Sequence, residues 1–298
     1  MKWLGVLLAA QVAIGLTFAL LVATDSLPFV DDEDDSADAA RPPPDRFDSA
    51  RAFRLLREQV ELGPRPAGSD ASRRLAARLR GLLPNGRYQS IPSHPGLRNV
   101  VGSVRGRDPK RVVVVGAHYD TKDESGFVGA NDGASGTAIV TELARTTRPR
   151  RLRPTVVFIL FDGEESPRGT ADADFEKRGL RGSKVAANRY GRAQAMILLD
   201  FVGDKRLRIP REQYSDARLW GRLRAAAARA GAGRAFPEEI SGGVLDDHIP
   251  FARRGVPSID LIDFDFACFH RPCDDLSAVS ERSVDSVGET VRRLLASL

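Results

Sequence analysis

Apolar and polar positions divide the chain into an apolar N-terminal run, a short polar stretch and a long region of alternating patterns. The run Trp3–Ala23 is almost continuously apolar and is long enough to span a bilayer as a helix. We therefore expect residues 1–24 to be an N-terminal membrane anchor, or a signal peptide cleaved after the small-residue site Leu21–Ala23. Because Lys2 precedes the run, either alternative predicts an extracytoplasmic protein, secreted or anchored to the membrane.

The polar stretch that follows is typical of a linker. Residues 25–46 contain the sequence DDEDDSADAARPPPD, which is acidic and then proline-rich and has few side chains that can build a core. We expect the folded domain to begin near Phe47 and to comprise residues 47–298.

Within this domain, helical and strand patterns alternate. Period-3.6 patterns predict helices over Ala50–Leu62, Ser69–Leu83, Gly136–Arg145, Lys177–Arg189, Asp216–Ala230 and Ser280–Leu298. Apolar, β-branched runs predict strands over Asn99–Val104, Arg111–His118, Thr155–Asp162, Ala195–Phe201 and Val256–Asp263. This alternation predicts a single α/β domain, a three-layer α/β/α fold around a mostly parallel, mixed central sheet.

Composition and charge restrict the classes of protein. The chain is 42% hydrophobic and 29% charged, which excludes a wholly disordered chain, and its two cysteines exclude a disulfide-rich scaffold. The net charge of +5 combines six acidic residues within positions 31–40 with a net charge of +11 over positions 41–298. The arginines are scattered and no aromatic residues interleave with them, so we expect a solvated basic surface and no nucleic-acid partner.

The chemistry-bearing residues follow the predicted strands. His118 and Asp120 close the second strand, and Glu164 and Glu165 follow the third. The remaining members of the set are Asp132, in the segment NDGASG, Asp200, at the end of the fourth strand, and His270, after the last one. Carboxylates gathered at one sheet edge repel one another unless a cation compensates them. Imidazole and carboxylate ligands together suit zinc.

These motifs resemble the M28 family of zinc peptidases and, within it, the glutaminyl cyclase branch, over residues 47–298. The order His-x-Asp, Asn-Asp-Gly-Ala-Ser-Gly, Asp-Gly-Glu-Glu, Asp and a final His is similar to the family pattern. The resemblance implies that Asp132, Glu165 and His270 hold the catalytic zinc. It implies a second metal site completed by His118 and Asp200, with Asp120 orienting His118 from behind.

The resemblance also implies catalytic roles for Glu164, Asp200 and Asp246. Glu164 matches the general base or proton shuttle. The segment Leu245-Asp246-Asp247-His248 looks like the cyclase version, in which the first aspartate belongs to an active-site hydrogen-bond network. His248 either contacts the substrate or pins this loop by hydrogen bonds. Phe269 stands where the cyclases have a pocket-lining tryptophan, which affects the expected substrate preference more than metal binding.

Two activities follow from the resemblance. A cyclotransferase, the first choice, converts an N-terminal glutamine of a peptide or protein to pyroglutamate and releases ammonia, with Glu164 as proton shuttle and one zinc ion. An aminopeptidase uses Glu164 to deprotonate a water molecule that hydrolyses the first peptide bond, with two zinc ions. A receptor-like homologue without catalysis is a third alternative. In each case we expect a monomer, contacting the membrane only through an uncleaved N-terminal segment.

Two further features flank the expected site. Cys268 and Cys273 bracket His270, and in an exported chain they can form a disulfide that fixes this loop. The alternatives are two free thiols or Cys268 as a metal ligand. The segment Ser166–Leu180 is expected to form a flexible rim loop that gates the substrate.

Overall fold

The computed structural model describes residues 46–149 and 152–298. The expected anchor or signal peptide at residues 1–24 lies outside the described residues, as does the expected linker up to residue 45. Among the residues described, no helix has both the length and the apolar character needed to cross a membrane. The expected location and membrane contact therefore remain predictions.

The described residues form a mixed six-stranded sheet with the order β1-β2-β4-β3-β5-β6. Its strands are β1 (Arg87–Ser90), β2 (Arg98–Val104), β3 (Asp108–His118), β4 (Pro154–Phe161), β5 (Ala195–Asp200) and β6 (Ser258–Ile262). The four strands β4, β3, β5 and β6 run parallel, whereas β1 and β2 pair antiparallel at one side. The parallel strands therefore bring their carboxyl ends to one edge.

Side chains alternate between the two faces of the central strands, as a strand with period two requires. On β3, Val113 and Val115 belong to the larger hydrophobic core, while Val114 between them belongs to a smaller core on the opposite face. On β5, Ile197 and Leu198 divide in the same way. Because both faces are buried, these strands read as continuous apolar runs in the sequence.

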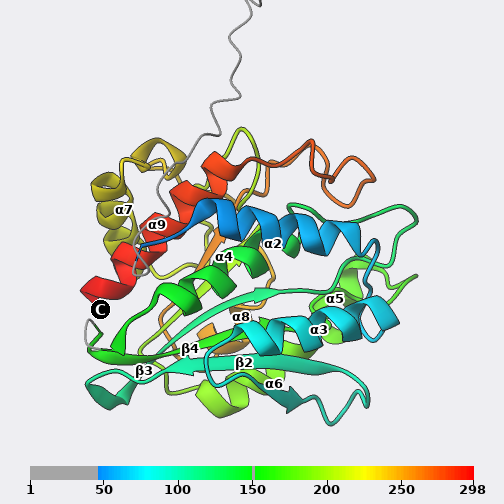
Figure 1. Ribbon diagram of the computed structural model, residues 1–298, viewed down its shortest axis with the longest axis horizontal. Coiled ribbons are helices and arrows are strands. Elements are labelled where there is room, and N and C mark those ends of the chain that lie inside the picture. The colour runs from blue at the N-terminus through cyan, green and yellow to red at the C-terminus, as the bar shows by residue number, and fades with distance from the viewer. Residues whose placement is uncertain (1–45, 150–151) are drawn as a thin grey trace, which may run out of the picture. The chain divides into compact units, whose positions relative to one another are not determined.

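Helices cover both faces and complete three layers (Figure 1). The larger core contains side chains from α2 (Ser49–Glu61), α3 (Asp70–Leu82), α4 (Ala134–Thr146), α7 (Ala217–Ala230) and α9 (Glu281–Ser297). The smaller core contains side chains from α6 (Arg181–Tyr190) and α8 (Ile249–Ala252). Short helical segments also lie between these elements in the described part of the chain, among them η2 (Asp172–Asp174), α5 (Phe175–Arg178) and η3 (Gly233–Ala235). The predicted α/β/α fold with a mostly parallel mixed sheet is confirmed.

Some elements differ from the prediction. The helix expected over Lys177–Arg189 is interrupted, because Leu180 has a left-handed backbone with φ +54° between α5 and α6. The expected rim loop Ser166–Leu180 contains both η2 and α5, so part of it is helical. The short elements β1 and α8 were not predicted.

The beginning of the folded part packs against its last helix. Phe47 is buried, and a Cβ atom added to Gly288 of α9 would lie 2.3 Å from the Phe47 ring. Asp48 then caps α2 by accepting a hydrogen bond from the backbone N–H of Arg51. Phe47 thus connects the segment before α2 to α9.

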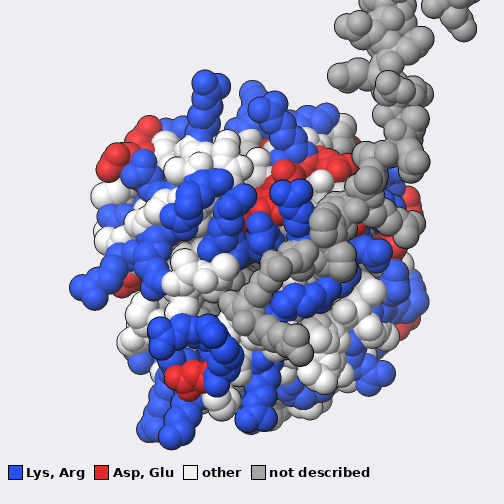
Figure 2. Space-filling view, turned by 60° about the vertical axis from the view of Figure 1, so that its left-hand side comes forward, with Lys and Arg blue, Asp and Glu red and all other residues white. Residues whose placement is uncertain are grey.

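The surface is rich in basic side chains. Figure 2 shows Lys and Arg spread over much of the visible face, with Asp and Glu in smaller groups between them. This distribution resembles a solvated basic surface more than a single binding stripe.

Candidate metal centre and substrate pocket

The carboxyl ends of the parallel strands bring the predicted site residues together. His118 ends β3, Asp200 ends β5, and Glu164 and Glu165 follow β4 after a turn at Gly163. Asp132 lies just before α4, and its backbone N–H donates to Asp274 at 3.0 Å. Residues far apart in the sequence therefore converge because one sheet edge collects them.

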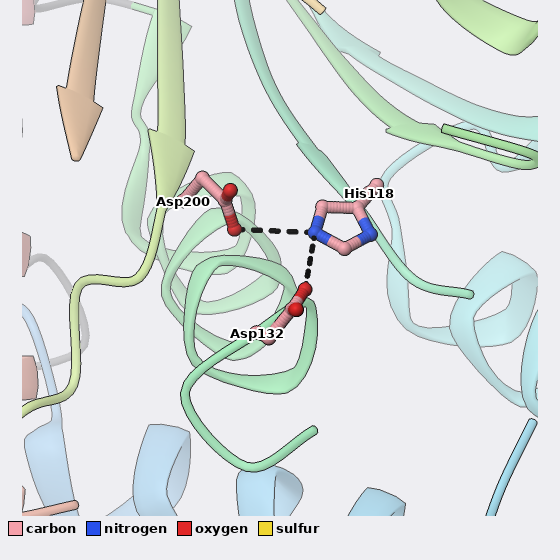
Figure 3. A group of neighbouring side chains, drawn as sticks. All are labelled: His118, Asp132 and Asp200. Carbon is pink, nitrogen blue, oxygen red and sulfur yellow. Dashed lines mark hydrogen bonds and ion pairs between the residues drawn. The ribbon is translucent and has the colours of Figure 1, made fainter. Parts of the chain in front are cut away.

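A first group of ligand atoms surrounds His118 (Figure 3). Its Nε2 lies 3.1 Å from Asp132 Oδ1 and 3.1 Å from Asp200 Oδ1. The Nδ1 atom lies 3.1 Å from the backbone carbonyl oxygen of Asp120, which fixes the ring from behind. The side chains of His118, Asp132 and Asp200, which could all act as metal ligands, are buried.

A second group shares Asp132 with the first. The Nε2 atom of His270 lies 3.4 Å from Asp132 Oδ2 and 3.2 Å from Glu165 Oε1. In each group, one ligand atom from every residue lies within 4.8 Å of the others. Asp132 therefore offers one oxygen to each group, as a carboxylate between two ion positions would.

The donor set fits a zinc ion. Each group supplies one imidazole nitrogen and two carboxylate oxygens, a combination that leaves a tetrahedral ion one open position. Asp132 Oδ2 is buried and accepts no hydrogen bond from the described residues, although an acceptor in such a position normally has a donor. A cation at that point would satisfy it.

Burial and neighbouring charges shift the pKa values of the ionisable side chains at the site. Burial raises the pKa of Glu164 well above its usual value, and the neighbouring Glu165 adds to the effect. Burial likewise raises the pKa of Asp200 to about 7, although His118 opposes this. For His270, burial lowers the pKa, but Asp132 and Glu165 outweigh it and bring the pKa to about 9. These carboxylates and imidazoles form an acid-rich cluster that a bound cation would stabilise.

The second group opens into a pocket of about 580 Å³. Asp132, Glu165 and His270 all line it, whereas His118 does not. The predicted residues Glu164, Asp200, Asp246 and Phe269 also line it. Part of the expected rim segment contributes as well, since Ser166–Thr170, Asp172 and Phe175 are lining residues.

Asp120 does more than face His118. Its carboxylate accepts hydrogen bonds from the backbone N–H groups of Gly163, Glu164 and Glu165, at 3.0 to 3.3 Å. Its Oδ1 atom is 3.8 Å from His118 Nδ1, which is too long for a hydrogen bond. The side chain therefore positions the turn that carries both glutamates, while its backbone carbonyl positions His118.

The loop that carries His270 is constrained at three points. Cys268 and Cys273 form a disulfide. Phe269 stacks on the His270 ring with centroids 3.9 Å apart. The buried Asp274 accepts hydrogen bonds from the backbone N–H groups that precede α4, at 2.7 and 3.0 Å. His270 itself has φ +50°, a conformation that the surrounding contacts must hold in place.

His248 lies outside the pocket. It is fully buried, with Nε2 3.3 Å from Glu212 Oε1 and Nδ1 3.6 Å from Asp260 Oδ2. Glu212 also accepts from the backbone N–H of Val244, a pocket-lining residue, at 3.3 Å. Neither ring nitrogen of His248 makes a hydrogen bond within the described residues, so both expected roles, a substrate contact and pinning of the loop by hydrogen bonds, remain predictions.

Three residues near the site were not found from the sequence. Arg65 is fully buried and donates to the backbone carbonyls of Tyr119 and Gly129, which flank the site. Lys122 donates to Glu165 Oε2 at 3.0 Å, and Asp274 was described above. A sequence signal existed for Arg65, because GPRPAGS places one arginine between two amphipathic helices, but nothing in the pattern marks it as buried.

Comparison with known proteins agrees with this geometry. The model of Peptidase family M28 matches residues 99–295. A glutaminyl-peptide cyclotransferase of Bos taurus is 30% identical over 225 residues, which cover 61% of this chain and 61% of the bovine protein. The chain therefore spans less than two thirds of that relative's length.

Solved structures of both activities resemble the fold. A glutaminyl cyclase of Bacteroides thetaiotaomicron has a TM-score of 0.74 and 25% identity, and covers 85% of this chain and 99% of its own. A leucine aminopeptidase precursor of the same species also has a TM-score of 0.74, with 26% identity and coverage of 85% and 98%. Overall similarity therefore does not separate the two activities.

Proposed function

The chain belongs to peptidase family M28, and from this membership we propose that it is a zinc-dependent glutaminyl-peptide cyclotransferase acting on peptide or protein N-termini. One observation carries the choice. All three residues of the group Asp132, Glu165 and His270 line the pocket, whereas in the other group Asp132 and Asp200 line it and the buried His118 does not. A single open metal position is what a cyclotransferase requires.

The proposed reaction assigns one role to each part of the site. Asp132, Glu165 and His270 would hold the zinc ion, which supplies Lewis-acid polarisation of the glutamine γ-carbonyl. The free α-amine attacks the carbon of that carbonyl (Cδ), so the lactam C–N bond forms as the bond from the same carbon to the amide nitrogen breaks. Glu164 accepts a proton from that amine and returns it to the departing amide nitrogen, so that ammonia leaves and pyroglutamate remains.

Glu164 and Asp246 suit this proton transfer by position. Both line the pocket and both are buried, so little water surrounds the group that moves the proton. Asp200 belongs to the group of His118, with its Oδ1 3.1 Å from His118 Nε2, and we assign it to orienting that imidazole.

A second candidate activity is an M28 aminopeptidase. It is favoured by the group His118, Asp132 and Asp200, which also presents three ligand atoms within 4.8 Å and shares Asp132 with the first. Here Glu164 would act as general base toward a water molecule. Two zinc ions per chain would then be expected.

The purified protein, loaded with zinc, is offered a glutamine-initiated peptide and a leucine amide, while ammonia, free leucine and bound zinc are measured. We expect ammonia release with one zinc per chain, and a loss of about 10²- to 10⁴-fold in Glu164→Gln with zinc retained. Leucine release without cyclisation would favour the aminopeptidase. Absence of both activities together with absence of metal would favour a receptor-like homologue.

A further inference from the structure

Among the described residues, the largest fully buried side chain is that of Arg65, in the segment between α2 and α3. Its Nε atom donates to the backbone carbonyl oxygen of Tyr119 at 3.3 Å. Its two terminal nitrogens donate to the carbonyl oxygens of Gln59, Val128 and Gly129, at 2.5 to 3.4 Å. Arginine is seldom buried in this way without a carboxylate partner. Within the described part of the chain, the guanidinium instead makes its hydrogen bonds to backbone oxygens.

These carbonyl groups lie on two segments that carry candidate metal ligands. Tyr119 directly follows His118 at the end of β3, whereas Val128 and Gly129 lie shortly before Asp132. Gly129 has φ +52°, and a Cβ atom added to it would lie 2.4 Å from the carbonyl oxygen of Asp132. One guanidinium therefore sets the spacing between the backbone of His118 and that of Asp132, whose side chains point toward each other (Figure 3).

Arg65 is itself held by the same part of the chain. Its backbone N–H donates to the hydroxyl oxygen of Thr121 at 3.0 Å, and its carbonyl oxygen accepts from the backbone N–H of Thr121 at 3.3 Å. Both the backbone and the side chain of Arg65 are thus bonded to residues that follow β3. A group fixed at both ends in this way can hold its neighbours at a constant distance.

The charge of Arg65 is retained at neutral pH. Burial lowers its pKa to about 10, although Asp132, Asp274 and Asp120 oppose the shift. These acids therefore help the core to hold a guanidinium, which otherwise costs free energy to bury. The side chain also brings a planar fork of N–H donors to this point, more donors than a neutral side chain offers.

We propose that Arg65 is a positioning residue for the candidate metal centre, because its guanidinium holds the backbone segments of His118 and Asp132 at a fixed spacing. This inference rests on the proposed function, since it takes the acid-rich cluster to be a metal centre. Ligands that are already correctly spaced need less rearrangement when an ion binds, and the affinity is higher for that reason. Arg65 acts in this way without contacting the ion or the substrate.

The test measures the zinc Kd by chelator competition and the visible absorption spectrum of the cobalt-loaded protein, together with urea unfolding. In Arg65→Met we expect the zinc affinity to fall about 10- to 100-fold and the cobalt bands to shift, because the two segments lose their common partner. Removal of a nearby positive charge would by itself strengthen the binding of a cation, so a weaker affinity reports the spacing and not the charge. Arg65→Lys keeps some of the donors and should lie between Arg65→Met and the wild type.

Arg224→Met is the matched control. Arg224 also donates to a backbone carbonyl, that of Phe236 at 3.2 Å, but it belongs to α7 and does not line the pocket. We expect the zinc affinity and the cobalt spectrum of this variant to equal those of the wild type, whatever its stability in urea.

The outcomes separate the two proposals. A zinc affinity in Arg65→Met that equals or exceeds that of the wild type overturns the inference and leaves the cyclotransferase standing. If Arg65→Met does not fold, Arg65→Lys decides, since a several-fold weaker zinc affinity supports the inference and wild-type affinity with unshifted cobalt bands overturns it. Failure of both variants to fold also overturns it, because Arg65 would then serve the fold as a whole. If the wild type binds zinc but cyclises no glutamine peptide, the proposed function fails, while the zinc and cobalt measurements still decide the role of Arg65.

Discussion

At the scale of single residues, the two oxygens of Glu165 have different partners. Oε1 faces His270 Nε2 at 3.2 Å, and Oε2 accepts from Lys122 at 3.0 Å. Lys122 therefore turns one oxygen away from the candidate metal position and directs the other toward it. Groups that hold a metal ligand in this way commonly matter almost as much as the ligand.

Lys122→Met is expected to weaken zinc binding by about 10- to 100-fold, since the carboxylate of Glu165 loses the partner that orients it. Lys122→Arg, which keeps a donor, should recover most of the affinity. Competition with a zinc chelator of known affinity measures both variants. Zinc binding in Lys122→Met as tight as in the wild type would contradict the assigned role.

A second residue-scale prediction concerns pH. Burial raises the pKa of Asp263 from 3.8 to about 6, and the acids Asp204 and Asp265 add to this despite a hydrogen bond from the Arg208 N–H. The folded state therefore binds a proton more tightly than the unfolded state. The free energy of unfolding therefore falls as pH rises from about 4 to 6, because the folded state must then hold a charged Asp263 carboxylate. Above that range the loss is complete.

Asp263→Asn removes this loss of stability, and its amide oxygen can still accept the hydrogen bond from the backbone N–H of Arg208. We expect the variant to be more stable than the wild type by about 1 to 2 kcal/mol at pH 7.5, and equal to it near pH 3.5, the shift being worth about 1.4 kcal/mol per pKa unit before screening. Urea unfolding at both pH values measures this. A stability difference that is the same at both would disprove the linkage.

At the scale of elements, the loop after β6 shows how covalent and noncovalent constraints combine on one ligand. The Cys268–Cys273 disulfide closes a short loop around His270. Asp274, the residue after Cys273, accepts a hydrogen bond from the backbone N–H of Asn131 in the segment before α4. Loop closure of this length is worth about 2 kcal/mol by chain entropy. The constraint acts on a loop rather than on the core.

The double variant Cys268→Ser/Cys273→Ser is therefore expected to keep the fold but to lose about 2 kcal/mol of stability and part of its zinc affinity. Circular dichroism would report the fold, thermal unfolding the stability, and chelator competition the zinc. Unchanged zinc binding together with lowered stability would mean that the disulfide stabilises the loop but does not contribute to zinc affinity.

Prediction from sequence succeeded for elements whose patterns are long. The buried strands β3, β4 and β5 and the amphipathic helices have enough residues for periodicity to be read, and the strand-end rule then brought His118, Asp132 and Asp200 together. The four-residue elements β1 and α8 are too short to show a period. Arg65, Lys122 and Asp274 act through tertiary contacts with backbone or carboxylate groups, which no local pattern encodes.

At the scale of the whole molecule, a bound metal ion would be linked to the fold. Both ligand groups draw on residues that follow different strands, so an ion bound there joins β3, β4, β5 and the loop after β6. A ligand that binds only the folded state stabilises it by mass action.

Removal of zinc by a chelator is therefore expected to lower the melting temperature. At a free zinc concentration of about 100 times Kd the lost stabilisation is about 2.7 kcal/mol, or roughly 5 to 10 °C for a domain of this size. Differential scanning calorimetry with and without chelator measures it, and added zinc should reverse it. A melting temperature indifferent to the chelator would mean that the protein is isolated without the ion.

The packing of Phe47 on Gly288 has a consequence for chain connectivity. Phe47, just before α2, lies on Gly288 of α9, and about 15 Å of helix separates Gly288 from Leu298. A short linker could therefore join the end of α9 to the start of α2, and new ends could be opened in the exposed stretch around Gly169. Such a circular permutant would leave both ligand groups in place while making the pocket rim the beginning and end of the chain.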